Sequence, residues 1–438
     1  MRLFYAIVIS VLFAVPARAE VDIKEVTSPG GLKAWLVEEP SIPFVALEIR
    51  FRGGASLDAP DKRGAINLMT ALLEEGAADM DARGFARASE ALATSFGFDV
   101  GDDSLSISAR FLTENRDASI ALLRAALQEP RFDAEAIERV RGQVLSSIRS
   151  DLKDPNNIAR ETMDQIIYGD HPYATSLNGT LDSVAALTRD DLVAAHQAVL
   201  ARDRIFIGAV GDITPDVLGA LVDDLLGDLP ATGAAMPPPA EVNIETGVTV
   251  VDYATPQSVA IFAQKGLTQK DPDWFAASVM NQILGGGSFE SRLMEEVREK
   301  RGLTYGVYSY LLPRDLAATY QGSVSSANDR IAQAIDVIRD EWRKMAENGA
   351  TEEELLNAKT YITGSYPLRF DGNAQIASIL VGMQMLDLPI DYIPTRNDKV
   401  DAVTLDDVKR VAAELLTPDN MTFVVVGQPE GIESTVAN

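Results

Sequence analysis

Residues 285 to 308 read GGGSFESRLMEEVREKRGLTYGVY. The three glycines end the segment before them, and Ser288 can cap a new helix because its hydroxyl can accept a backbone hydrogen bond from the first turn. Phe289, Leu293 and Val297 follow at helical spacing and give that helix one apolar face. The next glycine predicts the end of the helix, and the aromatic and β-branched residues after it predict a strand.

Two polar side chains of this stretch are candidate functional residues. Arg298 falls in the last helical turn, and Tyr305 falls early in the predicted strand, seven positions later. A turn between a helix and a strand can bring a guanidinium and a phenol to the same cleft. The helix dipole alone also favours an arginine in a last turn, and a strand tyrosine commonly serves only packing. Spacing alone therefore favours a structural role for both residues.

The segment VREKRGLTYGV resembles the C-terminal half of the pitrilysin family of zinc peptidases, which includes mitochondrial processing peptidase and insulin-degrading enzyme. In that family an arginine and a tyrosine seven residues apart, followed by glycine, hold the substrate backbone across the cleft from the zinc. The resemblance implies this role for Arg298 and Tyr305. It also implies an α+β fold with two homologous domains, each a mainly antiparallel sheet packed with helices.

Composition limits the compartment and the partners of the 438-residue chain. The formal net charge of −26 argues against binding to nucleic acid or to an anionic membrane. The N-terminus has the pattern of a signal peptide: Arg2 gives a positive start, LFYAIVISVLFAV is a short apolar run, and Ala17–Ala19 offers a cleavage site before Glu20. The chain has no cysteine, so it has no disulfide or lipoprotein anchor. These features predict a periplasmic protein with no membrane span after cleavage.

Two segments of the chain match each other without a gap. Val184–Asp212 and Val400–Pro429 each contain, four residues after the start, a threonine that can cap an amphipathic helix, Thr188 in one and Thr404 in the other. Two acidic residues follow that threonine, and an apolar strand ending in glycine comes after the helix. The constant offset between the matches indicates two copies of one domain.

A segment rich in proline, alanine and glycine separates the copies and predicts a linker. The boundaries follow from it: a signal peptide over 1–19, an N-terminal domain over 20–228, a linker over 229–247 and a C-terminal domain over 248–438. Early neighbouring strands and later helices in each copy favour an α+β layer.

The first domain lacks the family's zinc motif. Active members carry His-x-x-Glu-His on the first helix, where two imidazoles bind zinc and the glutamate is the general base. GAINLMTALLEEG, Gly64–Gly76, keeps the glycines at both ends of that helix. Asn67 and Ala71 occupy the two histidine positions, and Thr70 occupies the glutamate position. An amide is a poor zinc ligand, a methyl group cannot coordinate, and a threonine hydroxyl cannot act as a general base near neutral pH.

The family's distal glutamate ligand falls on Ser147, or on its neighbour Ser146. The chain has two histidines, His171 and His196. The first opens a stretch similar to a family loop, where we expect a turn residue. The second lies on an amphipathic helix, where we expect it to pack or to face solvent. The sequence therefore predicts a preserved fold with an erased zinc site and no cofactor of its own.

The favoured function is a non-catalytic, substrate-binding subunit of a two-subunit zinc metalloendopeptidase. In this interpretation a heterodimer forms with a zinc-bearing family member, and the Arg/Tyr pair acts on a peptide bound at the partner's zinc. One alternative is a structural or interaction protein with no peptidase role, like the core subunits of the respiratory bc1 complex, which resemble this family. Another is a self-sufficient enzyme with an unrecognised site.

We expect export and cleavage after Ala19, because a charged start, a short apolar run and a small-residue site occur in that order. Intact-mass measurement of protein from the cell envelope checks this. A mature species that still begins at Met1 would contradict it.

Overall fold

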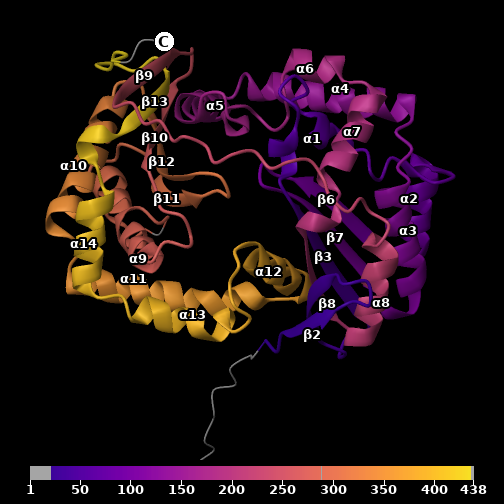
Figure 1. Ribbon diagram of the computed structural model, residues 1–438. Helices are drawn as coiled ribbons and strands as arrows, with labels where there is room; N and C mark the ends of the chain where they lie inside the picture. The colour runs from indigo at the N-terminus through magenta and orange to yellow at the C-terminus, as the bar shows by residue number, and fades with distance from the viewer. Residues whose placement is uncertain (1–20, 288, 436–438) are drawn as a thin grey trace, which may run out of the picture.

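The computed structural model describes residues 21–287 and 289–435. It has two halves that face each other (Figure 1). The predicted signal peptide, residues 1–19, and the predicted helix cap Ser288 lie outside the described residues. Residues 227–246, which connect the halves, form neither helix nor strand. Within the described residues, every helix is too short or too polar to cross a membrane.

The first half is built on a six-stranded sheet with the order β1-β2-β8-β3-β7-β6. Its neighbouring strands are antiparallel except for β2 and β8. The strands are β1 (Lys24–Thr27), β2 (Lys33–Glu38), β3 (Phe44–Arg52), β6 (Ser95–Val100), β7 (Ser104–Leu112) and β8 (Ile205–Gly211), with β4 (Gly76–Ala77) and β5 (Met80–Asp81) as a separate small pair. The helices are α1 (Ala65–Thr70), α2 (Ala82–Ala91), α3 (Arg116–Gln128), α4 (Ala134–Asp151), α5 (Pro155–Tyr168), α6 (Leu181–Ala186), α7 (Arg189–Val199) and α8 (Pro215–Leu226), with the 3-10 turns η1 (Gly54–Leu57), η2 (Thr113–Asn115), η3 (Pro172–Ala174) and η4 (Arg202–Arg204).

The second half repeats this plan with a five-stranded sheet in the order β11-β12-β10-β13-β9. Again one neighbouring pair is parallel, β13 with β9, and the others are antiparallel. The strands are β9 (Gly247–Asp252), β10 (Gln257–Lys265), β11 (Val307–Pro313), β12 (Ala318–Ala327) and β13 (Thr422–Gly427). The helices are α9 (Trp274–Leu284), the π-helix η5 (Met294–Glu299), α10 (Ile331–Asn348), α11 (Glu352–Ser365), α12 (Asn373–Met385), α13 (Tyr392–Asp401) and α14 (Leu405–Leu415), with the 3-10 turns η6 (Tyr366–Phe370) and η7 (Pro418–Asn420). The predicted α+β fold with two homologous, mainly antiparallel halves is confirmed.

The internal repeat extends to the hydrogen bonds that begin two helices. In α7 the Thr188 hydroxyl accepts from the Asp191 N–H, and the Asp191 carboxylate accepts in return from the Thr188 N–H. Thr404 and Asp407 form the same reciprocal pair at the start of α14. Each pair satisfies two backbone donors that a helix N-terminus leaves free, which explains the matching sequence.

A glycine closes the strand after each of these helices for a steric reason. Gly211 ends β8 with φ of 140°, and Gly427 ends β13 with φ of 151°. A Cβ at Gly211 would lie 2.2 Å from the Phe44 carbonyl oxygen, and one at Gly427 would lie 2.3 Å from the Ser258 hydroxyl oxygen. Both strands are central in their sheets, so neither position accepts a side chain.

Each half covers the sheet of the other half with one of its own helices. Helix α5 of the first half packs on β10 and β13 of the second sheet (Figure 1). Met163 and Ile167 of α5 are buried there in one cluster with Val259 and Val424. Burial of such a side chain contributes about 1.5–3 kcal/mol, so α5 fastens the halves together.

Helix α12 of the second half makes the reciprocal contact with β3 and β8 (Figure 1). Ala377 and Leu380 of α12 share a buried cluster with Trp35, Ala46 and Val210 of the first sheet. Successive side chains of β3 point to opposite faces of the sheet, so each face packs against a different partner. One face packs against the core of the first half, and Ala46 lies on the opposite face, toward α12.

We expect Leu380→Ala to lower the free energy of unfolding by about 2–5 kcal/mol, because Leu380 is fully buried between the halves. Chemical denaturation followed by circular dichroism is the measurement. Leu368→Ala, a control at a side chain that is 78% exposed, should change the value by less than about 0.5 kcal/mol. Equal effects of the two substitutions would contradict a shared core.

Candidate functional site

Helix α1, where the sequence places the erased zinc motif, begins at a left-handed glycine. Gly64 has φ of 94°, and the Asp58 carboxylate accepts hydrogen bonds from the N–H groups of Gly64 and Ile66, both at 2.8 Å. Burial raises the pKa of Asp58 to about 6, although the two hydrogen bonds and Arg63, 3.6 Å away, oppose the rise. The framework that positions this helix is therefore intact.

The three motif positions on α1 have different surroundings. Thr70 is buried, and its hydroxyl donates to the Ile66 carbonyl at 2.7 Å. Ala71 is exposed and has no donor atom. Asn67 is half-buried, and its amide nitrogen donates to the side-chain oxygen of Asn178 at 3.1 Å. Since structural and catalytic zinc sites use imidazole, thiolate or carboxylate ligands, these residues do not fit a zinc ion.

A network of amides and one carboxylate lies beside Asn67. The Asn178 amide donates to one oxygen of Asp151 at 3.3 Å, and the Asn157 amide donates to the other at 3.0 Å. Asn67 is linked to this carboxylate through Asn178. Asn67, at the first histidine position of the motif, is thus held in a hydrogen-bond network with Asn178 and Asp151. The sequence did not predict this network, because its members lie far apart in the chain.

The distal ligand position lies on α4 and faces solvent. Ser147 and its neighbour Ser146 are both exposed there. Asp151 follows one helical turn after Ser147, on the last turn of α4. Within the described residues, no group of three His, Cys, Asp or Glu side chains is arranged to hold a metal ion.

A polar cavity of about 320 Å³ adjoins this network, and sequence reasoning missed it. Asp151, Asp164 and Arg314 are among the residues that line it. Arg314 comes from the second half and lies 4.8 Å over the ring of Tyr173, with Asp164 4.0 Å away. Burial raises the pKa of Asp164 to about 6 even though Arg314 opposes the rise. The cavity therefore holds a charge cluster contributed by both halves.

The segment that carries Arg298 differs from the predicted helix in one respect. Leu293 and Val297 are buried as predicted, but Phe289 is 71% exposed. Phe289 lies in a turn before the helical residues begin, so the apolar face starts one turn later than the spacing predicts. Its ring stacks on the Arg298 guanidinium at 4.9 Å, and Glu299 pairs with that guanidinium at 3.0 Å. Arg298 lies in the last turn of η5, as expected.

Tyr305 lies in the loop before β11, and the prediction that it falls within the strand is wrong. Its side chain is 89% exposed. The neighbouring Thr304 anchors the loop, because its hydroxyl donates to the Ser325 carbonyl at 2.6 Å and accepts from the Gly306 N–H at 3.0 Å. With the loop held by Thr304, the phenol of Tyr305 is presented to solvent and is not used in packing.

The two histidines have structural surroundings. His171 begins the turn η3, where its Nδ1 accepts from the Tyr173 N–H at 3.2 Å, so it is the turn residue that the sequence predicts. His196 contacts the Leu127 carbonyl through Nε2 at 2.7 Å. Burial lowers the pKa of His196 below its ordinary value, although the bond to Leu127 opposes this.

Models of protein families match most of the chain. One described as insulinase, peptidase family M16, matches residues 33–181, and one described as the peptidase M16 inactive domain matches residues 186–362. A protein of Helicobacter pylori named non-peptidase homolog YmxG is 27% identical over 390 residues, which are 89% of this chain and 90% of that protein.

Two solved structures have the same fold. A structure described as the peptidase M16 inactive domain from Pseudomonas fluorescens is 30% identical, covers 95% of this chain and 99% of its own, and has a TM-score of 0.87. A protease from Helicobacter pylori is 16% identical with a TM-score of 0.83 over 93% of this chain and 99% of its own, which shows similarity of fold alone.

We expect the purified mature chain to hold no stoichiometric zinc, because an amide, a methyl group and a hydroxyl occupy the ligand positions Asn67, Ala71 and Ser147. Elemental analysis after gel filtration is the measurement. The variant Asn67→His, Ala71→His, Ser147→Glu restores three ligand types and should gain zinc, with weak affinity where groups that orient such ligands are missing. One tightly held zinc per wild-type chain would refute the erased site.

Proposed function

The chain belongs to the insulinase family of peptidases, peptidase family M16, and we propose that it is a non-catalytic, substrate-binding subunit of a two-subunit zinc peptidase. The observation that carries the proposal is an asymmetry between the halves. The first half has lost the zinc ligands, at Asn67 and Ala71, while the second presents Arg298 and an exposed Tyr305. The name of the Helicobacter pylori relative, a non-peptidase homolog, supports a role without catalysis.

The exposure of Tyr305 argues for a functional role. A tyrosine that is 89% exposed stabilises little by packing, and Thr304 fixes the loop without it. Arg298 is partly buried, and Phe289 and Glu299 limit its side-chain freedom. A guanidinium held in this way loses less conformational entropy when it binds a peptide carbonyl.

A partner subunit is supported by the distribution of exposed apolar side chains. Nine large hydrophobic side chains are exposed among the described residues, and six of them lie between residues 289 and 368. They are Phe289, Tyr305, Tyr308, Leu356, Tyr361 and Leu368. We place the partner on this half, because exposed apolar side chains that gather into a patch mark surfaces that another protein covers.

In the assembled peptidase the partner's zinc would supply Lewis-acid catalysis. Tyr305 would donate a hydrogen bond to the oxyanion that forms when the scissile carbonyl is attacked, or to the carbonyl itself before attack. Arg298 would hold a neighbouring backbone carbonyl in fixed geometry. Both residues come from the second half, so they would act only where this half closes over the partner's site. The N-terminal signal pattern supports assembly in the periplasm.

We expect Tyr305→Phe to lower turnover of the assembled peptidase by roughly 10²–10³-fold, because one oxyanion donor is lost. The measurement is peptide cleavage after reconstitution with the zinc-bearing partner, with gel filtration to show that assembly is unchanged. Tyr308→Phe is the matched control, since Tyr308 is a half-exposed neighbour that stacks on Tyr310. Arg298→Ala should also weaken peptide binding. Its control is Arg301→Ala, at an exposed arginine of the same segment whose partner Glu296 keeps a second cation, Lys300, at 2.6 Å.

Wild-type cleavage by both Tyr305→Phe and Arg298→Ala would refute the substrate-binding role. Arg292, on the same segment, does not serve as a control because Glu354 binds it through two hydrogen bonds, at 2.6 and 2.8 Å. Its removal would leave a partly buried carboxylate without its partner and destabilise the fold.

A further inference from the structure

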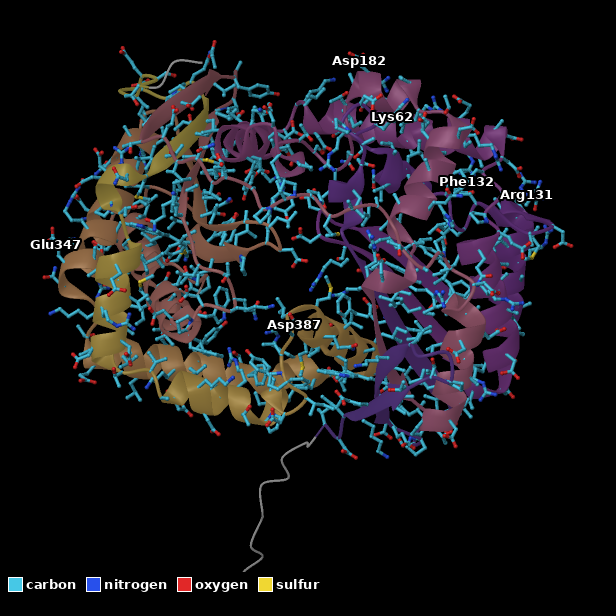
Figure 2. All side chains as sticks on the ribbon, viewed as in Figure 1. Lys62, Arg131, Phe132, Asp182, Glu347 and Asp387 are labelled. Atoms are coloured by element: carbon cyan, nitrogen blue, oxygen red, sulfur yellow. The ribbon has the colours of Figure 1, made fainter. Side chains whose placement is uncertain are left out.

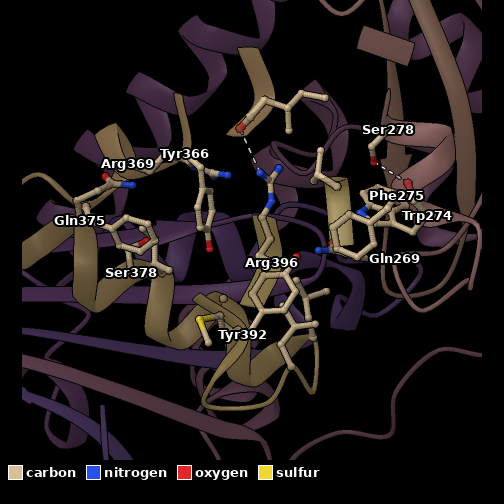
Figure 3. Close-up of a pocket in the computed structure, with 18 of the residues that line it drawn as sticks. Gln269, Trp274, Phe275, Ser278, Tyr366, Arg369, Gln375, Ser378, Tyr392 and Arg396 are labelled. Carbon is tan, nitrogen blue, oxygen red and sulfur yellow. Dashed lines mark hydrogen bonds between the residues drawn. The ribbon is translucent and has the colours of Figure 1, made fainter. Parts of the chain in front are cut away.

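A second cavity lies where helices of the second half meet β3 of the first half. Its volume is about 420 Å³, within the range of small-ligand pockets. Figure 3 shows Arg369, Arg396, Tyr366 and Tyr392 around it. They come from η6 and α13, and α9 contributes Trp274. Nothing in the peptidase mechanism proposed above uses these residues.

The lining of this cavity has an unusual charge for this protein. Asp and Glu make up 65 of the 438 residues, yet none of the 20 lining residues is acidic and three are arginines. Exposed carboxylates such as Asp182 and Glu347 lie instead on the outer helices (Figure 2). The cavity is therefore a positive site in a strongly negative molecule.

Within the described part of the chain, two of the three arginines have no carboxylate partner. Arg50 is neutralised by Glu48, 3.2 Å away, and donates to Ser378 at 2.7 Å. Arg396 donates to two neutral oxygens, the Ile362 carbonyl at 3.1 Å and the Asn397 side chain at 3.0 Å. Among the described residues Arg369 forms no ion pair.

Aromatic rings surround these charges. The Arg396 guanidinium lies 4.5 Å over the ring of Tyr366, and Trp274, Phe275 and Tyr392 line the same space. Burial lowers the pKa of Arg396 and the nearby charge of Arg369 acts in the same direction, although Tyr392 and Tyr366 oppose the shift. A bound anion would offset this unfavourable environment, and an apolar group beside it would displace water from the rings.

We propose that this cavity binds the free C-terminal carboxylate of a peptide whose last side chain is aromatic or aliphatic. The carboxylate would pair with Arg396 and Arg369, and the last side chain would pack on Trp274 and Tyr366. Guanidinium groups match carboxylates because two N–H donors can reach the two oxygens. The assignment deepens the proposed function, on which it rests for the choice of a peptide.

Helix α9 connects the cavity to the strand that follows the Tyr305 loop. Helix α9 begins at Trp274 in the cavity and ends at Leu284, so its 11 residues span about 16 Å. Beyond its end the Gly285 carbonyl accepts from the Ser309 N–H at 2.7 Å, on the strand that follows the Tyr305 loop. About five residues of extended chain would cover the length of α9.

Isothermal titration of the isolated mature chain tests the proposal. The probe is an N-acetylated pentapeptide of four alanines and a C-terminal phenylalanine, compared with its C-terminal amide and with N-acetylphenylalanine. We expect the acid to bind at least about tenfold more tightly than the amide, since a charge-assisted pair is lost in the amide. Arg369→Gln, at an exposed side chain, and Arg396→Gln should each remove most of that difference.

Arg87→Gln is the matched control, because it removes the same charge from an exposed position on α2 and should leave binding unchanged. Equal affinity for acid and amide, or an acid preference that survives both cavity substitutions, would overturn the proposal. Binding of N-acetylphenylalanine as tight as that of the pentapeptide would assign the cavity to small organic acids and overturn the peptide assignment. No partner peptidase is present in this assay, so its result is independent of the turnover measured with Tyr305→Phe.

Discussion

The structure depends on a reciprocal contact, in which each half covers the sheet of the other half with one of its helices. Helix α5 of the first half packs on the second sheet, and α12 of the second half packs on the first sheet. Removal of either helix would expose an apolar sheet face to water, so each half depends on a helix of the other to cover that face. Arg314 adds a polar link at the same junction, where it lies between Tyr173 and two carboxylates of the first half. The relative position of the halves is thus set by packing on both sides.

This constraint explains how a zinc site can be lost without loss of the fold. The Asp58 carboxylate still accepts a hydrogen bond from the first turn of α1. Asn67, at a ligand position of the family motif, forms a hydrogen bond within the network around Asp151. The exposed loop of Tyr305 depends on none of these contacts, because Thr304 fixes it from within the second half. The two halves can therefore change separately. In this account the zinc site of the first half has been lost and the exposed Tyr305 loop of the second half has been kept.

The features that the sequence predicts correctly are those that depend on residues close together in the chain. Thr188 and Thr404 cap their helices as the repeated pattern indicates, and the fold class follows from the resemblance. The reciprocal contact of α5 and α12 could not be predicted, because an amphipathic pattern shows that a face is buried and not which sheet covers it. Tyr305 lies outside the strand that its neighbours predict, because the bonds of Thr304 to the next strand replace ladder pairing. The cavity around Arg396 joins residues of β3, α9, α11, η6, α12 and α13, so no spacing in the sequence reveals it.

The central claim is that this chain completes a zinc site that belongs to another chain. Native mass spectrometry of the protein isolated from its native cells, with the complex kept intact, measures this directly. The account predicts a one-to-one complex with a zinc-bearing chain of the same family, with a single zinc ion that remains with the partner on dissociation. A homodimer or a monomer free of any such chain, or zinc that remains with this chain, would contradict it.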